Sequence, residues 1–375
     1  MRDLVLLLIP LAFAVAVPTT WTVRWLSRRL NAVDTAPLPG QVKAPPRPVP
    51  NTGGAAIFLA IAGPIAAMLL LVRLAPGTLT SIFPPLTPHL PGLVSESGPA
   101  LAFLAGLTLL HVIGLIDDRT PLGPKFKLAV MLGVSAVVVL GTGTRLLTML
   151  DASVGGPWLS VLVTVLWIVA VTNAMNFMDN MDGLTGGVAA IAGGCFLAAA
   201  LMHDQWFVAA CLSLLIGGCL GFLIFNFPAP KASIFMGDGG SLVVGFTLAF
   251  LTVRTTYYVP DPAAAASAGW YAVFMPLVVL AVPLYDLASV VIIRLRAGKS
   301  PMVGDLNHLS HRLVRRGLSK RDAVLVIYGL TAITAIGGVS LGSLADWQAI
   351  LVFVQVMLVL LVLALYEGRS TPATM

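Results

Sequence analysis

The stretch LAFLAGLTLLHVIGLIDD, residues 101–118, is a long apolar run that ends in two adjacent carboxylates, Asp117 and Asp118. An ionisable side chain costs roughly 2.5 to 3.5 kcal/mol at the centre of a membrane helix, so such groups usually serve a function. Other apolar runs also end in acidic clusters, which contain Asp179, Asp182 and Asp238. The stretch therefore predicts a membrane helix with a functional site at its end.

The composition of the whole chain indicates a membrane protein. Of its 375 residues, 58% are hydrophobic and 10% are charged, and the mean hydropathy is +0.95. These values leave too little polar surface for a soluble globular protein. The three cysteines all lie within apolar runs and lack the spacing of a metal or redox motif, so no disulfide is expected. We expect an all-α polytopic integral membrane protein.

Eleven apolar runs approach the roughly 20 residues that a helix needs to cross the hydrocarbon core. They are 4–23, 53–72, 99–116, 128–141, 157–174, 186–202, 206–225, 240–257, 270–293, 323–342 and 348–366. The first is taken as a span and not as a signal peptide, because no small-residue cleavage site precedes its basic end. We expect residues 1–375 to form a single integral membrane domain, with a long external connection between Leu74 and Pro99.

The distribution of Lys and Arg predicts the orientation, because the cytoplasmic side of a membrane protein retains these residues. Of the 22 Lys and Arg residues, 18 follow odd-numbered runs. The N-terminus is therefore expected outside and the C-terminus in the cytoplasm. All the polar clusters then emerge on the cytoplasmic face, including His308 and His311. One active site on that face is predicted. The net charge of +6 fits this topology and anionic lipid headgroups, so no nucleic-acid partner is expected.

The motif HVIGLIDDRTPLGPKFKL, residues 111–128, combines an acidic pair with a downstream lysine. Adjacent carboxylates repel each other, so at least one should have a raised pKa unless a cation is near. Such a pair suits proton transfer or a divalent cation. Lys127 follows Asp117 across a Pro/Gly turn, so it can return to the same place and meet a phosphate. The alternative is an acidic pair that ends a helix and is solvated by water.

The motif TNAMNFMDNMDGLTGG, residues 172–187, repeats an oxygen-bearing side chain every three residues. The four are Asn173, Asn176, Asp179 and Asp182. Neighbours in this series face each other on a helix, but its two ends lie nearly opposite. We therefore expect the helix to unwind near Asn180 or Gly183, where irregular backbone can line a wet cavity. The side chains suit a hard cation or the edge of a base or sugar, with helix capping as the alternative.

The motif NFPAPKASIFMGDGGSLVVGF, residues 226–246, places one carboxylate, Asp238, among glycines. Glycines let the backbone turn tightly and approach a ligand closely. This setting is typical of Mg²⁺ beside phosphate, because Mg²⁺ is usually held by one or two carboxylates, substrate phosphates and water. The alternative is that Asp238 is the N-cap of a helix, and Ser241 is expected to cap the next helix.

Two basic segments complete the predicted site. Residues 283–322 carry eight Lys and Arg residues and the pair His308 and His311, which share one face if helical. Because zinc would need a third ligand nearby, phosphate contact or proton transfer is favoured over a solvated basic loop. The first cytoplasmic segment holds Lys43 on a stiff, proline-rich loop. There, anion binding and ordinary positive-inside topology explain the charge equally well.

Four motifs on this face resemble the polyprenyl-phosphate N-acetylhexosamine-1-phosphate transferases. They are GLIDDR…GPKFKL, NAMNFMDNMDGLTGG, IFMGDGGSL and HLSHRLVRRG, in that order, and the resemblance covers about residues 34–322. This superfamily, glycosyltransferase family 4, also contains the phospho-N-acetylmuramoyl-pentapeptide translocases. The resemblance implies transfer of a sugar 1-phosphate from a UDP-sugar to undecaprenyl phosphate, with release of UMP and a requirement for Mg²⁺ or Mn²⁺. It also implies a cell-envelope glycan pathway at the inner (plasma) membrane, with a homodimer as one candidate assembly.

The resemblance also implies roles for individual residues. Asp238 would be the main metal ligand, with Asn176 as a second contact. Asp117 and Asp118 would lie at the reacting lipid phosphate. The remaining catalytic residues would be Asp179 and Asp182 in the nucleotide pocket and the pair His308 and His311. The other substrate-binding residues would be Lys43, Lys127, Phe235 and Arg312.

The chain departs from the family pattern at several positions. Asn180 replaces a common glycine, Pro45 replaces a common histidine, and residues 308–311 retain two of the three usual histidines. The stretch from Asn226 to Asp238 is about two residues longer than usual, which puts a family role for Asn226 in doubt. HLSHRL is closer to the branch that uses simple UDP-N-acetylhexosamines than to the pentapeptide branch.

Two anionic reactants need nearby cations, so positioning and electrostatic stabilisation should do most of the catalytic work. We expect a one-step attack by the lipid phosphate on the sugar-linked phosphorus, with Asp117 as base or positioning group. An aspartyl-phosphate intermediate is the alternative mechanism. A cation-coupled transporter is the alternative function, although it predicts carboxylates near the bilayer midplane. The sequence does not identify the sugar.

Overall fold

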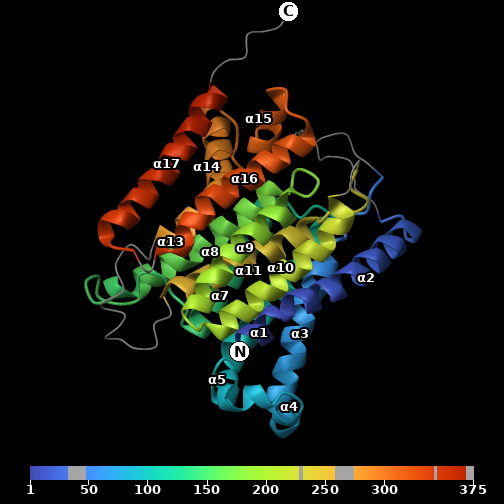
Figure 1. The fold of residues 1–375 in the computed structure, drawn as a ribbon. Helices are drawn as coiled ribbons and strands as arrows, with labels where there is room; N and C mark the ends of the chain where they lie inside the picture. Colours follow the sequence, from blue (N-terminus) through green and yellow to red (C-terminus); the bar gives the residue numbers. More distant parts are fainter. Residues whose placement is uncertain (33–47, 228–230, 258–273, 342–343, 369–375) are drawn as a thin grey trace, which may run out of the picture.

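The computed structural model describes residues 1–32, 48–227, 231–257, 274–341 and 344–368 (Figure 1). Every regular element in these ranges is a helix. The elements are α1 (Arg2–Leu6), α2 (Leu8–Arg29), α3 (Gly54–Leu74), α4 (Pro76–Ile82), η1 (Pro84–His89), α5 (Leu90–Ser95), α6 (Ser97–Asp117), α7 (Pro124–Thr142), η2 (Thr148–Leu150), α8 (Trp158–Met178), α9 (Leu184–Met202), α10 (Trp206–Asn226), α11 (Asp238–Tyr257), α13 (Phe274–Val279), α14 (Ala281–Arg296), α15 (Leu309–Arg315), α16 (Lys320–Val339) and α17 (Asp346–Gly368).

Nine helical segments in the described ranges are long and apolar enough to cross a membrane. They are α1 with α2, α3, α6, α7, α8, α9, α10, α16 and most of α17. The predicted class, an all-α polytopic membrane protein, is therefore confirmed. The two remaining predicted runs also coincide with helices. One is α11, which has Asp238 and Arg254 near its ends, and the other is divided into α13 and α14. The count of eleven spans and the orientation stay predictions.

The division between α13 and α14 has a local cause. Pro283 is the third residue of α14. Proline has no backbone N–H, so Pro283 cannot donate a hydrogen bond to the carbonyl of Val279 four residues earlier. Val279 is the last residue of α13. The apolar run 270–293 consequently does not continue as one straight helix over its described part.

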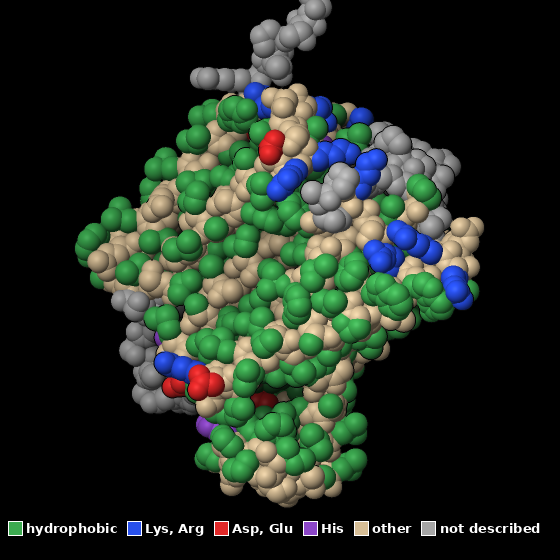
Figure 2. Space-filling view, turned by 45° about the vertical axis from the view of Figure 1, so that its right-hand side comes forward, with side chains coloured by type: hydrophobic (Ala, Val, Ile, Leu, Met, Phe, Trp, Pro, Cys, Tyr) green, Lys and Arg blue, Asp and Glu red, His purple; other side chains and the backbone are tan. Residues whose placement is uncertain are grey.

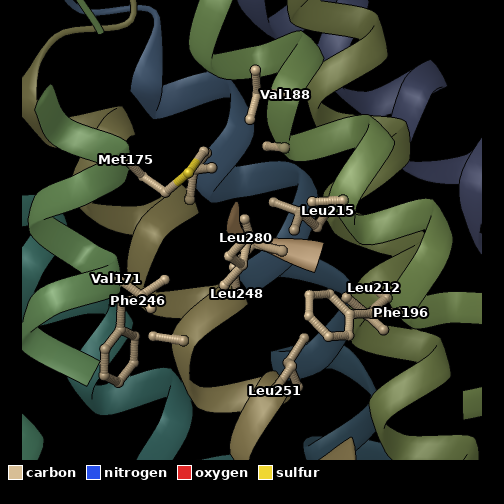
Figure 3. Packing of buried hydrophobic residues seen from close by; sticks show 14 of the residues in the cluster. Val171, Met175, Val188, Phe196, Leu212, Leu215, Phe246, Leu248, Leu251 and Leu280 are labelled. Carbon is tan, nitrogen blue, oxygen red and sulfur yellow. The ribbon is translucent and has the colours of Figure 1, made fainter. Parts of the chain in front are cut away.

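The apolar core lies among α8, α9, α10 and α11. Figure 3 shows Phe246, Leu248 and Leu251 of α11 pointing into side chains from the neighbouring helices. Phe246 and Phe250 stack on Phe103 of α6, with ring centroids 5.8 and 5.1 Å apart. By contrast, α17 exposes much of its apolar surface, and it lies on the opposite side of the bundle from α2 (Figure 1). Asp238 is therefore the first residue of a helix, α11, that is buried in the middle of the bundle.

The connection between Leu74 and Pro99 consists of short helices, α4, η1 and α5. Leu79 and Leu86 form a small apolar cluster with Val72 at the end of α3. At the far end of the connection, Glu96 accepts two hydrogen bonds of 2.8 Å from Arg254 of α11. The connection is thus folded onto the bundle, and it forms the lower projection in Figure 1.

The backbones of α6 and α11 touch where α11 begins. A Cβ atom on Gly114 of α6 would lie 2.5 Å from Gly239 Cα, closer than real Cβ contacts. One turn earlier on the same face of α6, the ring of His111 contacts Gly239 O through Nδ1 at 2.7 Å. The start of α11, and with it Asp238, is therefore held directly against α6.

We expect Gly114→Ala to lower the stability of the protein by about 1–3 kcal/mol, the usual cost of overpacking a core. The added methyl group must push the start of α11 away, so activity should fall as well. Gly133→Ala on α7 is the matched control, because a Cβ there meets no atom within 4 Å. Thermal unfolding in detergent measures both variants. Equal melting temperatures for the two would contradict the predicted contact.

Candidate active site

The acidic ends of α6 and α11 meet at the ammonium group of Lys127. Lys127 Nζ lies 2.9 Å from Asp117 Oδ2 and 2.5 Å from Asp238 Oδ2. The turn that returns Lys127 to Asp117 is closed by a 2.7 Å hydrogen bond from Leu122 N to Asp117 Oδ1. Gly123 in this turn has a φ of +84°, which favours glycine. The structure thus brings together two motifs that the sequence predicted to share one site.

Asn176, in the last turn of α8, belongs to the same cluster. Its Nδ2 atom donates to Asp238 Oδ1 at 2.9 Å and to Ser241 Oγ at 2.8 Å. α11 begins at Asp238, so Gly237 and not Asp238 precedes the helix as its N-cap residue, and the Asp238 side chain contacts Lys127 and Asn176. The expectation that Ser241 caps a helix is wrong, because Ser241 is the fourth residue of α11 and its hydroxyl contacts Asn176 and Gly237 O.

Asp118 differs from its neighbour, because its carboxylate binds backbone. Oδ1 accepts from Asp238 N at 3.0 Å, and Oδ2 accepts from Gly239 N at 3.2 Å. These are the first N–H groups of α11, which have no partner within the helix. The residue before them, Gly237, has no side chain and a φ of +72°, so a local cap is absent. Asp118 therefore caps α11 from another helix.

We expect Asp118→Asn to lower protein stability by about 1–2 kcal/mol, the upper part of the usual range for a lost helix cap. An amide keeps one acceptor oxygen, but its NH₂ group would face a backbone N–H. Asp204→Asn serves as the control, because Asp204 is exposed and has a φ of +52°, a conformation that asparagine tolerates well. Melting temperatures without added divalent cation test the prediction. An unchanged value for Asp118→Asn would rule out the cap as a stabilising contact.

The helix of the second motif unwinds as predicted. It ends at Met178, and Gly183 before α9 has a φ of +81°. Burial, together with the nearby charge of Asp238, raises the pKa of Asp179 to about 7. Asp182 Oδ2 accepts from Ala232 N at 3.2 Å. Both acidic residues therefore lie beside the segment that leads into α11.

Asn226 joins these two segments, a role that the sequence did not reveal. Its Oδ1 accepts from Gly183 N at 2.8 Å, and its Nδ2 donates to Ile234 O at 2.9 Å. Phe235 is fixed by backbone bonds to the segment before α3, from its N to Pro50 O at 2.7 Å and from Gly53 N to its O at 2.9 Å. The predicted nucleotide-binding residues thus lie on two segments, the α8–α9 connection and the stretch before α11, which Asn226 holds together.

The histidine segment docks on the end of α8. The His308 ring lies nearly perpendicular to the Phe177 ring, with centroids 5.5 Å apart, and Ser310 Oγ donates to Asn180 Oδ1. Burial and neighbouring cations lower the pKa of His311 to about 4. His311 is therefore neutral near pH 7 and can act there as a hydrogen-bonding group but not as a positive charge.

Arg312 and Lys43 are two further residues that the sequence predicted to bind substrate. Arg312 is buried and holds Glu367 of α17 with two bonds of 3.0 Å, and it also donates to Ser289 Oγ at 2.9 Å. A substrate contact by Arg312 would have to replace these partners, and it stays a prediction. Lys43 lies outside the described residues.

Figure 2 shows lysines and arginines gathered at the upper end and apolar side chains across the middle of the molecule.

The donor set fits a magnesium or manganese ion. Asp117 and Asp238 approach one positive charge, that of Lys127, so two anionic oxygen donors already converge on a cation. The described residues contain no group of three or more His, Cys, Asp or Glu side chains that could hold a metal. Mg²⁺ needs only one or two carboxylates when phosphates and water complete its octahedron. The arrangement therefore suits a cation shared with a phosphate substrate.

Comparison with known proteins decides the family. Residues 100–256 match the model of glycosyl transferase family 4. Over 86% of this chain and 78% of the relative, the sequence is 34% identical to a decaprenyl-phosphate N-acetylglucosaminephosphotransferase of Mycobacterium tuberculosis. The chain belongs to glycosyl transferase family 4. It is also 29% identical to a probable undecaprenyl-phosphate N-acetylglucosaminyl 1-phosphate transferase of Bacillus subtilis, over 98% of this chain and 94% of that protein.

A further relative is the undecaprenyl-phosphate alpha-N-acetylglucosaminyl 1-phosphate transferase of Escherichia coli K12. It is 30% identical over 71% of each chain. The resemblance noted from the motifs is thereby confirmed, and so is the prediction that the protein is an enzyme, a transferase. The family 4 match includes Asp117, Lys127, Asn176 and Asp238, which form the cluster described above.

Proposed function

We propose that this membrane enzyme transfers N-acetylglucosamine 1-phosphate, or a related N-acetylhexosamine 1-phosphate, from a UDP-sugar to undecaprenyl phosphate. The names of the relatives give a polyprenyl phosphate and an N-acetylglucosamine phosphate group, which two of them specify as the 1-phosphate. The observation that carries the proposal is the contact of Lys127 with both Asp117 and Asp238, because such a cluster matches the need of two phosphate substrates for fixed charges. We place the enzyme in the plasma membrane, at the first membrane step of a cell-envelope glycan pathway.

In the proposed reaction, an oxygen of the lipid phosphate attacks the phosphorus that bears the sugar. The new P–O bond forms as the bond to the UMP oxygen breaks, so the products are undecaprenyl-diphospho-sugar and UMP. Lys127 would neutralise phosphate charge, and Asp117 would orient the attacking phosphate or accept its proton. Asp238 and Asn176 would hold Mg²⁺ or Mn²⁺, which would neutralise charge on the phosphates when bound.

The geometry supports a division of roles within the acidic pair. Asp117 faces the ammonium group of Lys127, whereas both carboxylate oxygens of Asp118 accept backbone N–H groups of α11. We therefore assign contact with the lipid phosphate to Asp117. Asp118 would act through the position of Asp238.

The test is UMP release by the purified protein with UDP-N-acetylglucosamine, undecaprenyl phosphate and Mg²⁺. We expect release that requires both substrates and stops when the cation is chelated. If no member of a panel of UDP-N-acetylhexosamines yields UMP, the proposal fails and a cation-coupled transporter, which family membership disfavours, returns as the alternative. Labelled UDP-sugar without lipid separates the mechanisms, because a trapped phosphorylated enzyme would overturn the one-step attack.

A further inference from the structure

Asp286 is a buried carboxylate that has no role in the reaction proposed above. It lies in α14 and has no exposed surface. Its Oδ2 atom lies 2.9 Å from Nδ1 of His308, and its Oδ1 atom accepts from Leu309 N at 2.6 Å. A buried charge is costly unless it is paired and hydrogen-bonded, and here each oxygen has a partner. The carboxylate therefore fixes both the His308 ring and the start of α15.

This contact determines which ring nitrogen of His308 is available to a ligand. An ionised carboxylate only accepts hydrogen bonds, so the proton of His308 in this contact is on Nδ1. The other ring nitrogen, Nε2, has no hydrogen-bond partner among the described residues, although the residue is only 7% exposed. The described atoms that lack a partner and are sealed from solvent do not include Nε2, so this unpartnered nitrogen keeps some exposed surface. It is consequently open to a ligand.

The position of this ring links it to the acidic cluster. The His308 ring packs against the Phe177 ring, and the residue before Phe177 is Asn176, which donates to Asp238. The adjacent hydrogen bond between Ser310 and Asn180 holds the same two segments together. The His308 ring is thus placed beside the loop that carries Asp179.

We propose that Asp286 is a positioning residue, which holds His308 with Nε2 directed to an oxygen of the UDP-sugar diphosphate. The inference rests on the proposed function and adds a residue to it. With Nδ1–H donating to Asp286, only the protonated imidazolium of His308 has a second N–H, on Nε2, that can donate to a phosphate oxygen. The competing explanation is that Asp286 merely caps α15 through Leu309 N.

Asp286→Asn separates the two roles, because it retains an oxygen for Leu309 N. Its NH₂ group would face Nδ1 and favour the neutral ring over the imidazolium, so the contact of Nε2 with the diphosphate would lose its positive charge. We expect the KM for the UDP-sugar to rise about 10- to 100-fold, by analogy with partners that orient a metal-binding histidine, while the KM for undecaprenyl phosphate stays unchanged. Asp286→Glu keeps a carboxylate and should recover part of the loss. Wild-type KM values in Asp286→Asn would overturn the proposal.

His308→Asn provides a test that does not depend on the folding of the Asp286 variants. The asparagine amide can occupy the place of Nδ1 and keep the bond to Asp286, but nothing then occupies the place of Nε2. We expect wild-type thermal stability together with loss of the melting-temperature increase that UDP with Mg²⁺ produces in the wild type. An unchanged UDP-induced increase would show that His308 serves only the fold and would overturn the proposal.

A double-mutant cycle completes the test. If Asp286 acts through His308, adding Asp286→Asn to His308→Asn should cost no further activity, whereas fully additive losses would refute the link. UMP release by the wild type tests the proposed function separately. A wild type that releases no UMP defeats that function, while the UDP-induced change in melting temperature still tests the positioning role.

Discussion

Asp238→Asn is expected to reduce UMP release by more than about 100-fold, the upper end of the range for residues that only support a metal ligand. The amide keeps an oxygen acceptor for Asn176, but it removes the charge that would bind the cation and that faces Lys127. The loss should therefore appear in catalysis more than in folding. The measurement is the initial rate of UMP release across a Mg²⁺ titration.

A second readout for Asp238→Asn does not require activity. Mg²⁺ should raise the melting temperature of the wild type, and this increase should be absent or shifted to higher Mg²⁺ concentration in the variant. Asp322→Asn is the matched control, because Asp322 is exposed at the start of α16. A variant with the wild-type rate and the wild-type response to Mg²⁺ would remove Asp238 from the metal site.

Lys127→Met should both inactivate and destabilise the enzyme. Without the ammonium group, the carboxylates of Asp117 and Asp238 face each other with no positive charge between them. We expect a loss of about 2 kcal/mol in stability, less than the roughly 3–5 kcal/mol for breaking a fully buried pair, because the two carboxylates are 13% and 24% exposed. UMP release should fall at least about 100-fold, since each factor of ten needs only 1.36 kcal/mol of transition-state stabilisation.

The response of Lys127→Met to Mg²⁺ distinguishes charge from packing. If the lysine acts through its charge, added Mg²⁺ should restore part of the lost melting temperature, because a cation held by Asp238 would reduce the repulsion between the two carboxylates. The control is Lys125→Met, two residues earlier and exposed on α7, which should retain wild-type stability and activity. If Lys127→Met melts like the wild type without divalent cation, the ion pairs do not stabilise the fold.

The sequence predicted much of the fold because membrane helices leave a strong local signal. The run that ended at residue 116 corresponds to α6, which ends at Asp117, and the expected break near Gly183 lies between α8 and α9. The division of the run 270–293 was not predicted, although Pro283 provided a signal. The short helices between Leu74 and Pro99 were also missed, because proline-rich segments of this length have no clear periodicity.

The sequence also missed two residues that organise the site. Asp286 is an ionisable residue inside an apolar run, and by the rule that identified Asp117 it should have been considered functional. Asn226 ends an apolar run, but nothing in the sequence shows that its amide bonds to both Gly183 and Ile234. Such partners are distant along the chain, so local patterns do not specify them.

The sequence by itself determined the membrane class and the four motifs, because hydropathy and residue type are local properties of the chain. It also directed attention to the acidic pair after residue 116, but it treated the two carboxylates alike. Only the tertiary structure separated them. Asp117 faces Lys127, whereas Asp118 caps α11 about 120 residues later in the sequence. The physical reason is that the partner of a carboxylate depends on how the helices pack, and the close approach of Gly114 to Gly239 brings the start of α11 within reach of Asp118.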